Sequence, residues 1–455
     1  MAASNKTRIE HDLLGDRAVP ADAYYGVQTA RALENFQITG VPIHLYPNFI
    51  KGLAMVKLAA ARANFDTGGF SREILSAIEG ACAEILDGKL HDHFPLDVIQ
   101  GGAGTSTNMN ANEVIANRGL ELMGHQKGEY EFLDPLDHVN RAQSTNDAYP
   151  SSIHLGLILG NRELIAAYKE LVAAFAAKAT EFANILKMGR TQLQDAVPMT
   201  LGQEFKAFAR SLGDEVSALE RVQNVLYEVN MGGTAIGTGL NAPRGYAQKC
   251  ADHLAKISGF PIKLAEDLIE ATQDMQSFVL YSSVLKSLAI KLAKVGNDLR
   301  LLSSGPRTGL REINLPAMQP GSSIMPGKVN PVIPEVTNMV AYRVMANDLV
   351  VTLASEAGQL QLNAFEPVVA AVLFEGQTIL IKRGRHAAQV LRYGHHRQCG
   401  GVPALRRVQC WHDHSPEPGH RIQPCHGARG EGTEDRQGHS RAGAPGEGAD
   451  GQADR

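Results

Sequence analysis

A short segment marked by glycine and proline, GSSIMPGKVNP at residues 321–331, carries the side chains in this chain that are best suited to chemistry. Glycine permits backbone angles that other residues avoid and proline stiffens the chain, so the segment predicts a loop of defined shape that can open and close. It contains the hydroxyl of Ser322, the ammonium group of Lys328 and the amide of Asn330. Such groups can grip a carboxylate and move one proton. We therefore expect a lid over a small acidic substrate.

Three further clusters of hydroxyl and amide side chains stand at Gly- or Pro-marked joints between predicted helices. They are GGAGTSTNMN at residues 101–110, QSTND at 143–147 and MGRTQ at 188–192. The candidate residues in them are Thr105, Asn108, Ser144, Thr145, Asn146, Thr191 and Gln192. Taken one at a time, such residues at a helix start are usually caps. Taken together, neutral donors and helix N-termini from several loops predict a pocket for a small dianion.

The composition is that of a globular protein: 455 residues, 44% hydrophobic and 20% charged, with a formal net charge of −4. This length fits two or three domains. The charge offers no basic field for nucleic acid, and no apolar run approaches the roughly 18 residues of a membrane span, so we expect neither partner. The amino terminus lacks an apolar signal segment, and only Cys82 and Cys250 precede residue 380. Two cysteines are too few for a disulfide framework, which favours a reducing, cytoplasmic setting.

Hydrophobic side chains recur at steps of three and four residues over long stretches, which predicts long helices. The clearest seam spans residues 278–302, about 37 Å of α-helix. Its members are Phe278, Tyr281, Leu285, Leu288, Leu292, Val295, Leu299 and Leu302. Similar seams cover residues 164–182 and 212–226. Alternation of β-branched with polar residues is rare, so strands have little support. We predict an all-α fold built on a bundle of long helices.

These motifs are similar to those of a known family. The loop GSSIMPGKVNP matches the signature loop of the fumarase/aspartase superfamily of lyases letter for letter, and QSTNDAYP and GRTQLQDAVPMTLGQEF also resemble its sequences. The resemblance extends over residues 8–380. Thr145 and Gln192 favour the aspartase branch, because fumarases usually carry Ser at the first place, and fumarases and some aspartases carry His at the second. Gln192 cannot exchange protons, so a histidine-based relay is absent here.

The resemblance implies a homotetramer whose central helices form a twenty-helix bundle, with each active site assembled from three subunits. The implied reaction is the reversible deamination of L-aspartate to fumarate and ammonia through an aci-carboxylate intermediate. This chemistry requires no metal or organic cofactor, although family members can respond to divalent cations as activators. Two alternatives stay open: a class II fumarase that interconverts malate and fumarate, and a helical assembly with impaired or no catalysis.

The resemblance also assigns roles to the candidate residues. Ser322 is the implied general base, and cationic Lys328 with neighbouring backbone N–H groups would stabilise its alkoxide. The implied ligands of the β-carboxylate are Thr105, Thr191, Lys328 and Asn330, and those of the amino group and α-carboxylate are Ser144, Thr145 and Asn146. Asn108, Gln192 and Glu335 match positions of the family's pocket without a specific role.

We predict three regions: an N-terminal helical domain (1–143), a central long-helix bundle domain (144–382) and an aberrant tail (383–455). The tail contains eleven arginines and no lysine, and helical periodicity stops in it. The family continues here with a helical domain that contains motifs such as GITAN and ALNP. Codons for residues 395–399 and 411–419, read one base later, can encode Ile-Thr-Ala-Asn and a segment with Ala-Leu-Asn-Pro. We hypothesise a shifted reading frame; if the printed tail is real, its composition predicts disorder.

Sequencing the gene across the codons for residues 380–385 tests the frame hypothesis. We expect one base to be missing or added there, because a single shift restores both family motifs. A gene whose codons match the printed residues throughout would refute it.

Overall fold

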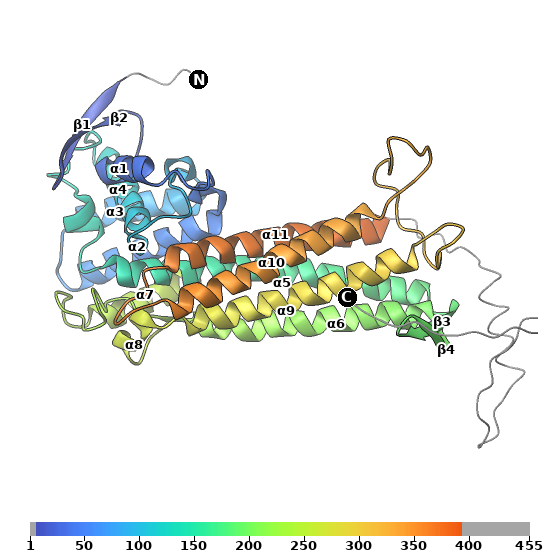
Figure 1. The fold of residues 1–455 in the computed structure, drawn as a ribbon. Helices are drawn as coiled ribbons and strands as arrows, with labels where there is room; N and C mark the ends of the chain where they lie inside the picture. The colour runs from blue at the N-terminus through green and yellow to red at the C-terminus, as the bar shows by residue number, and fades with distance from the viewer. Residues whose placement is uncertain (1–5, 394–455) are drawn as a thin grey trace, which may run out of the picture. The chain divides into compact units, whose positions relative to one another are not determined.

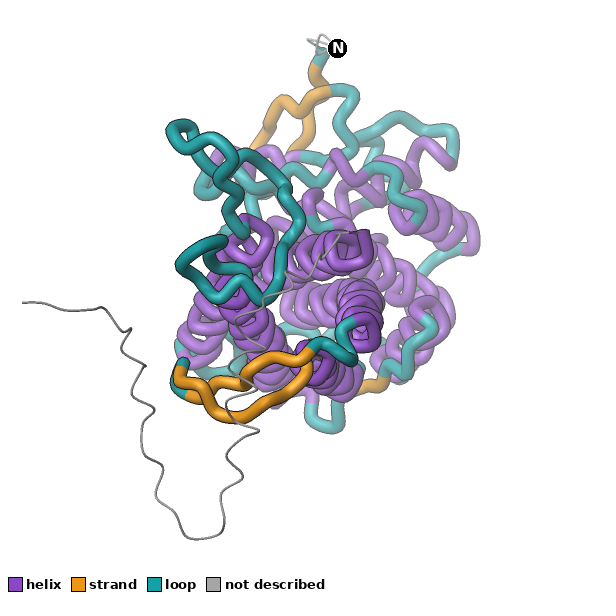
Figure 2. The backbone as a smooth tube through the Cα atoms, turned by 90° about the vertical axis from the view of Figure 1, so that its right-hand side faces the viewer, coloured by secondary structure: helices purple, strands orange, loops and turns teal. Residues whose placement is uncertain are grey.

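Five long helices lie side by side in the computed structural model, which describes residues 6–393 (Figure 1). They are α5 (Thr145–Glu181), α6 (Leu201–Val222), α9 (Gln276–Leu302), α10 (Val332–Glu356) and α11 (Glu366–Tyr393). Helix α5 packs against α6 and α11, α9 packs against α6 and α10, and α10 packs against α11. Figure 2 shows these helices nearly end-on. The predicted all-α fold with a bundle of long helices is confirmed.

The predicted hydrophobic seams form the core of this bundle. Every seam residue from Phe278 to Leu302 is buried on α9, and the seams of α5 and α6 are buried as well. Apolar stripes with this spacing let the helices pack against one another along their whole length. This packing determines which helix ends lie next to each other. None of the helices in the described part is both long and apolar enough to cross a membrane.

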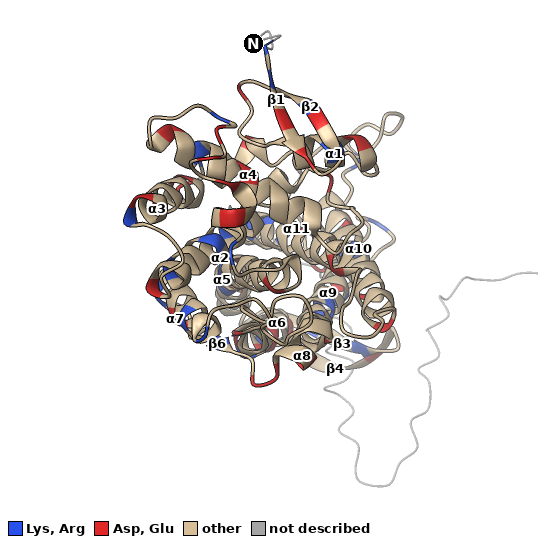
Figure 3. Ribbon diagram, turned by 90° about the vertical axis from the view of Figure 1, so that its left-hand side faces the viewer, with Lys and Arg blue, Asp and Glu red and all other residues tan. Residues whose placement is uncertain are grey.

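Shorter helices lie at the end of the bundle where α5 begins (Figure 3). They are α1 (Val27–Asn35), α2 (Pro47–Asp66), α3 (Arg72–Leu86), α4 (Thr105–Leu122), α7 (Tyr246–Ser258) and α8 (Leu268–Gln273). Single turns of 3₁₀-helix occupy Ile43–Leu45, His91–His93 and Gln223–Leu226, and a π-helix occupies Pro135–Val139. Helix α2 crosses α5 closely: a Cβ at Gly52 would lie 2.2 Å from the carbonyl oxygen of Ser152. Only glycine fits this crossing.

Three two-stranded sheets were not predicted. Strand β1 (Thr7–Asp12) pairs antiparallel with β2 (Gly15–Pro20), β3 (Leu186–Thr191) pairs antiparallel with β4 (Gln194–Thr200), and β5 (Glu228–Val229) pairs parallel with β6 (Lys263–Leu264). The two hairpins are largely exposed, and the parallel strands are two residues long. A strand without a buried face needs no alternation of apolar and polar residues, so the sequence pattern that marks strands is missing.

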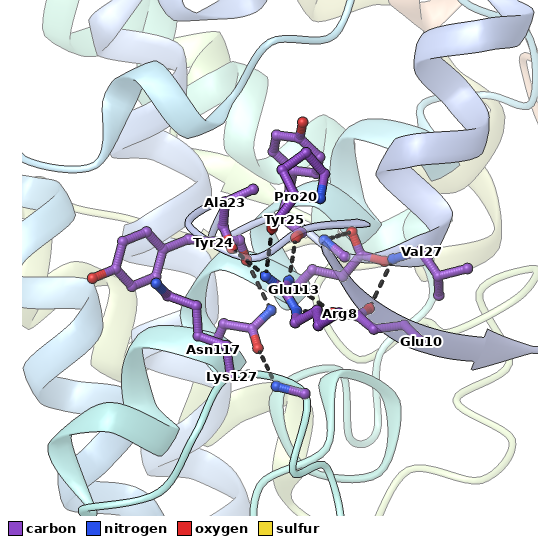
Figure 4. A network of polar contacts seen from close by, with 12 residues as sticks. Arg8, Glu10, Pro20, Ala23, Tyr24, Tyr25, Val27, Glu113, Asn117 and Lys127 are labelled. Atoms are coloured by element: carbon purple, nitrogen blue, oxygen red, sulfur yellow. Dashed lines mark hydrogen bonds and ion pairs between the residues drawn. The ribbon is translucent and has the colours of Figure 1, made fainter. Parts of the chain in front are cut away.

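A polar network anchors the N-terminal hairpin to α4 (Figure 4). The buried carboxylate of Glu113, on α4, accepts hydrogen bonds from the main-chain N–H groups of Gly26 and Gln28 at the start of α1, both at 2.8 Å. On β1, Glu10 pairs with Arg8 at 2.7 Å. Burial raises the pKa of Glu113 to about 7, while the N–H donors around it favour its charged form. The network fixes α4 against the N-terminal segment.

The two predicted region boundaries, at residues 143 and 383, differ in how they relate to the helices. Helix α5 begins at Thr145, so the boundary at 143 coincides with a helix start, and the division into domains there stays a prediction. Helix α11 continues across residue 383 to Tyr393, and the tail from residue 394 onward lies outside the described residues. Arg383 is 5% exposed and lines an apolar groove, and its Nε and Nη2 groups donate to no partner among the described residues. A buried guanidinium with unpaired donors is costly, and a shifted frame would produce such a conflict, so the frame hypothesis stays open.

Candidate active site

The QSTND segment forms the N-terminus of α5. Oγ of Ser144 accepts a hydrogen bond from the N–H of Asn146 at 3.2 Å, and the N–H of Ser144 donates to the carboxylate of Asp147 at 3.0 Å. This reciprocal capping box explains why the helix begins here. Thr145 is the first helical residue, and the side-chain amide of Asn146 donates to the carbonyl of Ala235 at 2.7 Å. The three predicted residues thus share one helix N-terminus, which attracts anions.

The GGAGTSTNMN segment lies beside it and starts α4. Thr105 is exposed in the first turn, where its hydroxyl donates to the carbonyl of Gly102 at 2.8 Å, and Asn108 is buried one turn later. Gly104 precedes the helix and touches α5: a Cβ at this position would lie 2.6 Å from the ring carbons of Tyr149. This close approach brings Thr105 and Asn108 next to the start of α5.

A buried lysine on α2, Lys57, joins these two helix starts. Its ammonium group donates to Oδ1 of Asn108 at 2.6 Å, to Oε1 of Gln143 at 2.8 Å and to Oδ1 of Asn140 at 3.1 Å. Burial lowers the pKa of Lys57 to about 7, whereas the three acceptor oxygens and nearby Asp147 favour its charged form. Lys57 was not predicted as a site residue, because its one signal in the sequence is a lysine inside the apolar run MVKLAAA. The amino-terminal half-site, as we call it, comprises Thr105, Asn108, Ser144, Thr145 and Asn146.

Thr191 and Gln192 lie at the exposed tip of the β3–β4 hairpin. Gln192 and Leu193 form its two-residue turn, with φ angles of 51° and 64°. Residues other than glycine adopt this left-handed region at a cost, and such strain concentrates at functional sites. The backbone of this turn is therefore strained, and the strain is the cost of holding the side chains of Gln192 and Leu193 at the tip.

The predicted lid is a closed loop in the connection between α9 and α10. The N–H of Gly321 donates to the carbonyl of Lys328 at 2.8 Å, and the amide of Asn330 donates to the carbonyl of Gly321 at 2.8 Å. Oγ of Ser322 accepts hydrogen bonds from the main-chain N–H groups two and three residues further on, at 3.1 and 2.9 Å. Two N–H donors on one oxygen stabilise negative charge there. The role of a general base for Ser322 stays a prediction.

A cleft of about 750 Å³ opens beside this loop, between the end of α9 and the start of α10. Lys328 and Asn330 line it together with Arg300 of α9 and Glu335 in the first turn of α10. Cationic and amide donors in one cleft suit a carboxylate. Ser322 lies in the loop outside the lining of the cleft. The carboxy-terminal half-site, as we call it, comprises Thr191, Gln192, Ser322, Lys328, Asn330 and Glu335.

Ion pairs hold the hairpin to the segment that leads into the loop. The carboxylate of Glu312 contacts Nη1 of Arg190 at 2.5 Å and Nζ of Lys187 at 2.8 Å, and both cations are on β3. Lys187 also pairs with Glu204 on α6 at 2.5 Å. The side chains of Lys187 and Glu312 are largely buried, so this cluster is better defined than exposed ion pairs. Hairpin and loop therefore occupy the same end of the bundle.

The two half-sites lie at opposite ends of α5 (Figure 1). Helix α5 has 37 residues, which corresponds to a length of about 55 Å. The amino-terminal half-site surrounds its first turn, whereas the hairpin follows its last residue, Glu181. Within the described residues, one chain therefore does not gather all the predicted side chains around one small substrate.

Comparison with known proteins identifies the family. A family model described as lyase matches residues 15–346. The chain is 61% identical over 381 residues to an aspartate ammonia-lyase from Pseudomonas aeruginosa, a match that covers 84% of this chain and 80% of that protein. The chain belongs to the fumarase/aspartase superfamily of lyases.

Solved structures of this superfamily share the fold. A crystal structure of fumarate lyase:delta crystallin from Brucella melitensis bound to cobalt is 50% identical, with a TM-score of 0.85 over 89% of this chain and 87% of that chain. A class II fumarase from Schistosoma mansoni is 34% identical, with a TM-score of 0.82 over the same shares of the two chains. Among residues 6–393 of this chain, no group of three or more His, Cys, Asp or Glu side chains could hold a metal ion.

Replacement of Lys57 by methionine tests how this member of the superfamily builds its amino-terminal half-site. The substitution leaves the amide oxygens of Asn108 and Gln143 without a donor, whereas Oδ1 of Asn140 keeps hydrogen bonds from two asparagine amides. We therefore expect the free energy of unfolding to fall by about 3 kcal/mol. Urea unfolding measures the loss. Lys51→Met, at a half-buried position of the same helix, is the matched control, with an expected change within about 0.5 kcal/mol. Equal stability of the two variants would contradict the role assigned to Lys57.

Proposed function

We propose that this chain catalyses the reversible elimination of ammonia from L-aspartate to give fumarate. The observation that carries the proposal is Ser322, whose Oγ receives two main-chain N–H groups inside a loop that also presents Lys328. The 61% identity to an aspartate ammonia-lyase over most of the chain supports the same substrate. The match to a class II fumarase supports the alternative substrate, malate, at lower identity, 34%.

In the proposed reaction Ser322 acts as the general base. Its alkoxide removes the proton from Cβ of aspartate, and the electron pair of that C–H bond moves into the β-carboxylate to form an aci-carboxylate dianion. The pair then returns to form the Cα–Cβ double bond as the C–N bond breaks. The amino group leaves as ammonia from its protonated form, so no acid is needed. Stabilisation of the dianion supplies most of the catalysis.

The proposed binding roles divide the substrate between the half-sites. The β-carboxylate, where charge accumulates, is held by Thr105, Thr191, Lys328 and Asn330. The amino group and the α-carboxylate are held by Ser144, Thr145 and Asn146 at the positive end of α5. Asn108 acts through its bond to Lys57, and Gln192 and Glu335 border the site. The proposed mechanism uses no metal or organic cofactor.

The complete enzyme is, on this proposal, a homotetramer with each site built from three chains and a central bundle of twenty helices. The separation of the half-sites along α5 supports it, because a second chain must supply the missing groups. Helix α10 also exposes an apolar stripe, which includes Val336, Met339, Tyr342, Leu349 and Leu353. Exposed stripes of this size mark interaction surfaces. Free, buried Cys82 and Cys250 fit the proposed cytoplasmic location.

Replacement of Ser322 by alanine is the direct test of the chemistry. We expect the rate of aspartate deamination, followed by the absorbance of fumarate, to fall about a thousandfold because the general base is lost. The assembly should remain intact by size-exclusion chromatography. Ser217→Ala, an exposed hydroxyl on α6, is the control and should keep the wild-type rate. An unchanged rate in Ser322→Ala would remove the serine from the mechanism, and faster turnover of malate than of aspartate in the wild type would favour the fumarase.

Mixing of two inactive variants tests whether one site draws on several chains. Asn146→Ala disables the amino-terminal half-site and Ser322→Ala the carboxy-terminal half-site. After joint unfolding and refolding, random assembly should give about one quarter of the wild-type activity, since each half-site is intact with a chance of about one half. If each chain built its own site, the mixture would stay inactive although native mass spectrometry showed mixed assemblies.

A further inference from the structure

A cavity of about 360 Å³ with an acidic lining lies near the amino-terminal half-site. Four acidic residues from three elements and one connecting segment line it: Glu228 of β5, Glu270 of α8, Asp274 between α8 and α9, and Glu366 of α11. Lys263 is the one lysine or arginine among the described residues of the lining, and its Nζ is already paired with Glu228 at 2.8 Å. Burial and then the neighbouring carboxylates raise the pKa of Glu270. The lining therefore has an excess of acidic over basic residues.

Glu366 distinguishes this cavity from an ordinary cluster of surface acids. The residue is 3% exposed, and its Oε2 is buried without a hydrogen-bond partner. A buried carboxyl oxygen without a donor is costly unless something that is bound supplies one. Burial raises the pKa of Glu366 well above its usual range, which expresses the same deficit. The side chain thus lacks a donor or a cation.

His154 does not supply the missing positive charge. Its Nδ1 lies 2.9 Å from the carbonyl oxygen of Glu228 and its Nε2 lies 2.9 Å from Oγ of Ser277. A neutral imidazole that donates from Nδ1 and accepts the serine hydroxyl at Nε2 satisfies both contacts. Burial lowers the pKa of His154 to about 4, in agreement with a neutral ring. The histidine is therefore a polar part of the lining that carries no positive charge to neutralise the carboxyl groups.

The cavity shares a wall with the amino-terminal half-site. Asn230 lines the cavity, and its side-chain amide donates to the main-chain carbonyl of Asn146 at 3.0 Å and to Oγ1 of Thr272 at 3.1 Å. Ser151, one turn further along α5 than Asn146, lines it as well and donates to Oδ1 of Asn230 at 3.4 Å. The side chain of Asn230 would therefore lie between a ligand in the cavity and Asn146, one of the residues proposed to hold the amino group and the α-carboxylate.

The chemistry of the lining favours an ammonium ion over a bare metal ion. The carboxyl groups do not converge as metal ligands, because no group of three or more such side chains in residues 6–393 could hold a metal. An ammonium ion instead donates separate hydrogen bonds in tetrahedral directions, and dispersed oxygen acceptors suit it. The volume admits such an ion together with several waters.

We propose that this cavity binds an ammonium ion, with Glu366 as its principal acceptor, and that it receives the ammonium released at the neighbouring half-site. The second part rests on the proposed function, since it takes ammonium to be the product. The first part is independent of turnover, because it rests on the unpartnered carboxyl, the surrounding acids and the volume.

Binding is tested on the full chain without reference to activity. Crystals soaked in thallium(I) acetate, whose cation substitutes for ammonium, should show an anomalous peak beside Oε2 of Glu366. Ammonium chloride should raise the melting temperature of the wild type by about 2–4 °C over sodium chloride at equal ionic strength. Glu366→Gln should abolish this difference in melting temperature. If that variant does not fold, Asp274→Asn replaces it and should have the same effect. Glu266→Gln, an exposed acid outside the lining, should keep it.

Kinetics of the reverse reaction test the link to turnover. In Glu366→Gln we expect the KM for ammonium to rise about tenfold while the KM for fumarate stays unchanged, because a charge-assisted hydrogen bond is lost. Equal melting temperatures in the two salts together with no thallium peak overturn the binding site, as does a partner subunit's basic side chain found in the cavity. If the wild type bound thallium but showed no deaminase activity, the proposed function would be wrong and the binding site would stand.

Discussion

Helix α5 runs for 37 residues and carries Ser144, Thr145 and Asn146 at its start, whereas the hairpin with Thr191 and Gln192 follows its end. A small dicarboxylic acid cannot reach across a helix of about 55 Å. This separation governs the rest of the structure. The long seams of α5, α6 and α9 keep the bundle straight, and the straight bundle keeps the two half-sites apart. The exposed apolar stripe of α10 offers a surface on which other chains can bring complementary half-sites together.

The half-sites stabilise charge by different physical means. The amino-terminal half-site combines the N-termini of α4 and α5 with neutral side chains, and the ammonium group of Lys57 lies buried behind it, bonded to Asn108 and Gln143. Asp147 lies on the other side of the same capping box, and burial raises its pKa to about 7. The carboxy-terminal half-site instead presents exposed Lys328 at an open cleft, which exposed Arg300 also lines. A mostly neutral surface at one end of α5 thus contrasts with a cationic cleft at the other end.

Much of this arrangement could be read from the sequence. The steps of three and four residues in residues 278–302 predicted α9, because a helix core leaves a strong periodic signal. The motif around Ser144 also indicated a helix start, and the glycines and prolines around Ser322 predicted a loop of defined shape. Lys57 escaped notice because a single lysine in an apolar helix has no local signal, and its partners come from segments that are far away in the sequence. The β3–β4 hairpin escaped for a related reason: its faces are largely exposed, so nothing forces its residues to alternate.

The turn at Gln192 and Leu193 has a consequence for anyone who redesigns this protein. Both residues hold left-handed backbone angles that an asparagine or glycine would adopt more readily. Selection for thermal stability alone would therefore favour asparagine or glycine at both positions of the turn. Selection for turnover would keep Gln192, which is proposed to border the site. Leu193 is exposed and makes none of the proposed contacts, so the two kinds of selection differ at this residue. A glycine at position 193 would relax the backbone and leave the side-chain amide of Gln192 in place.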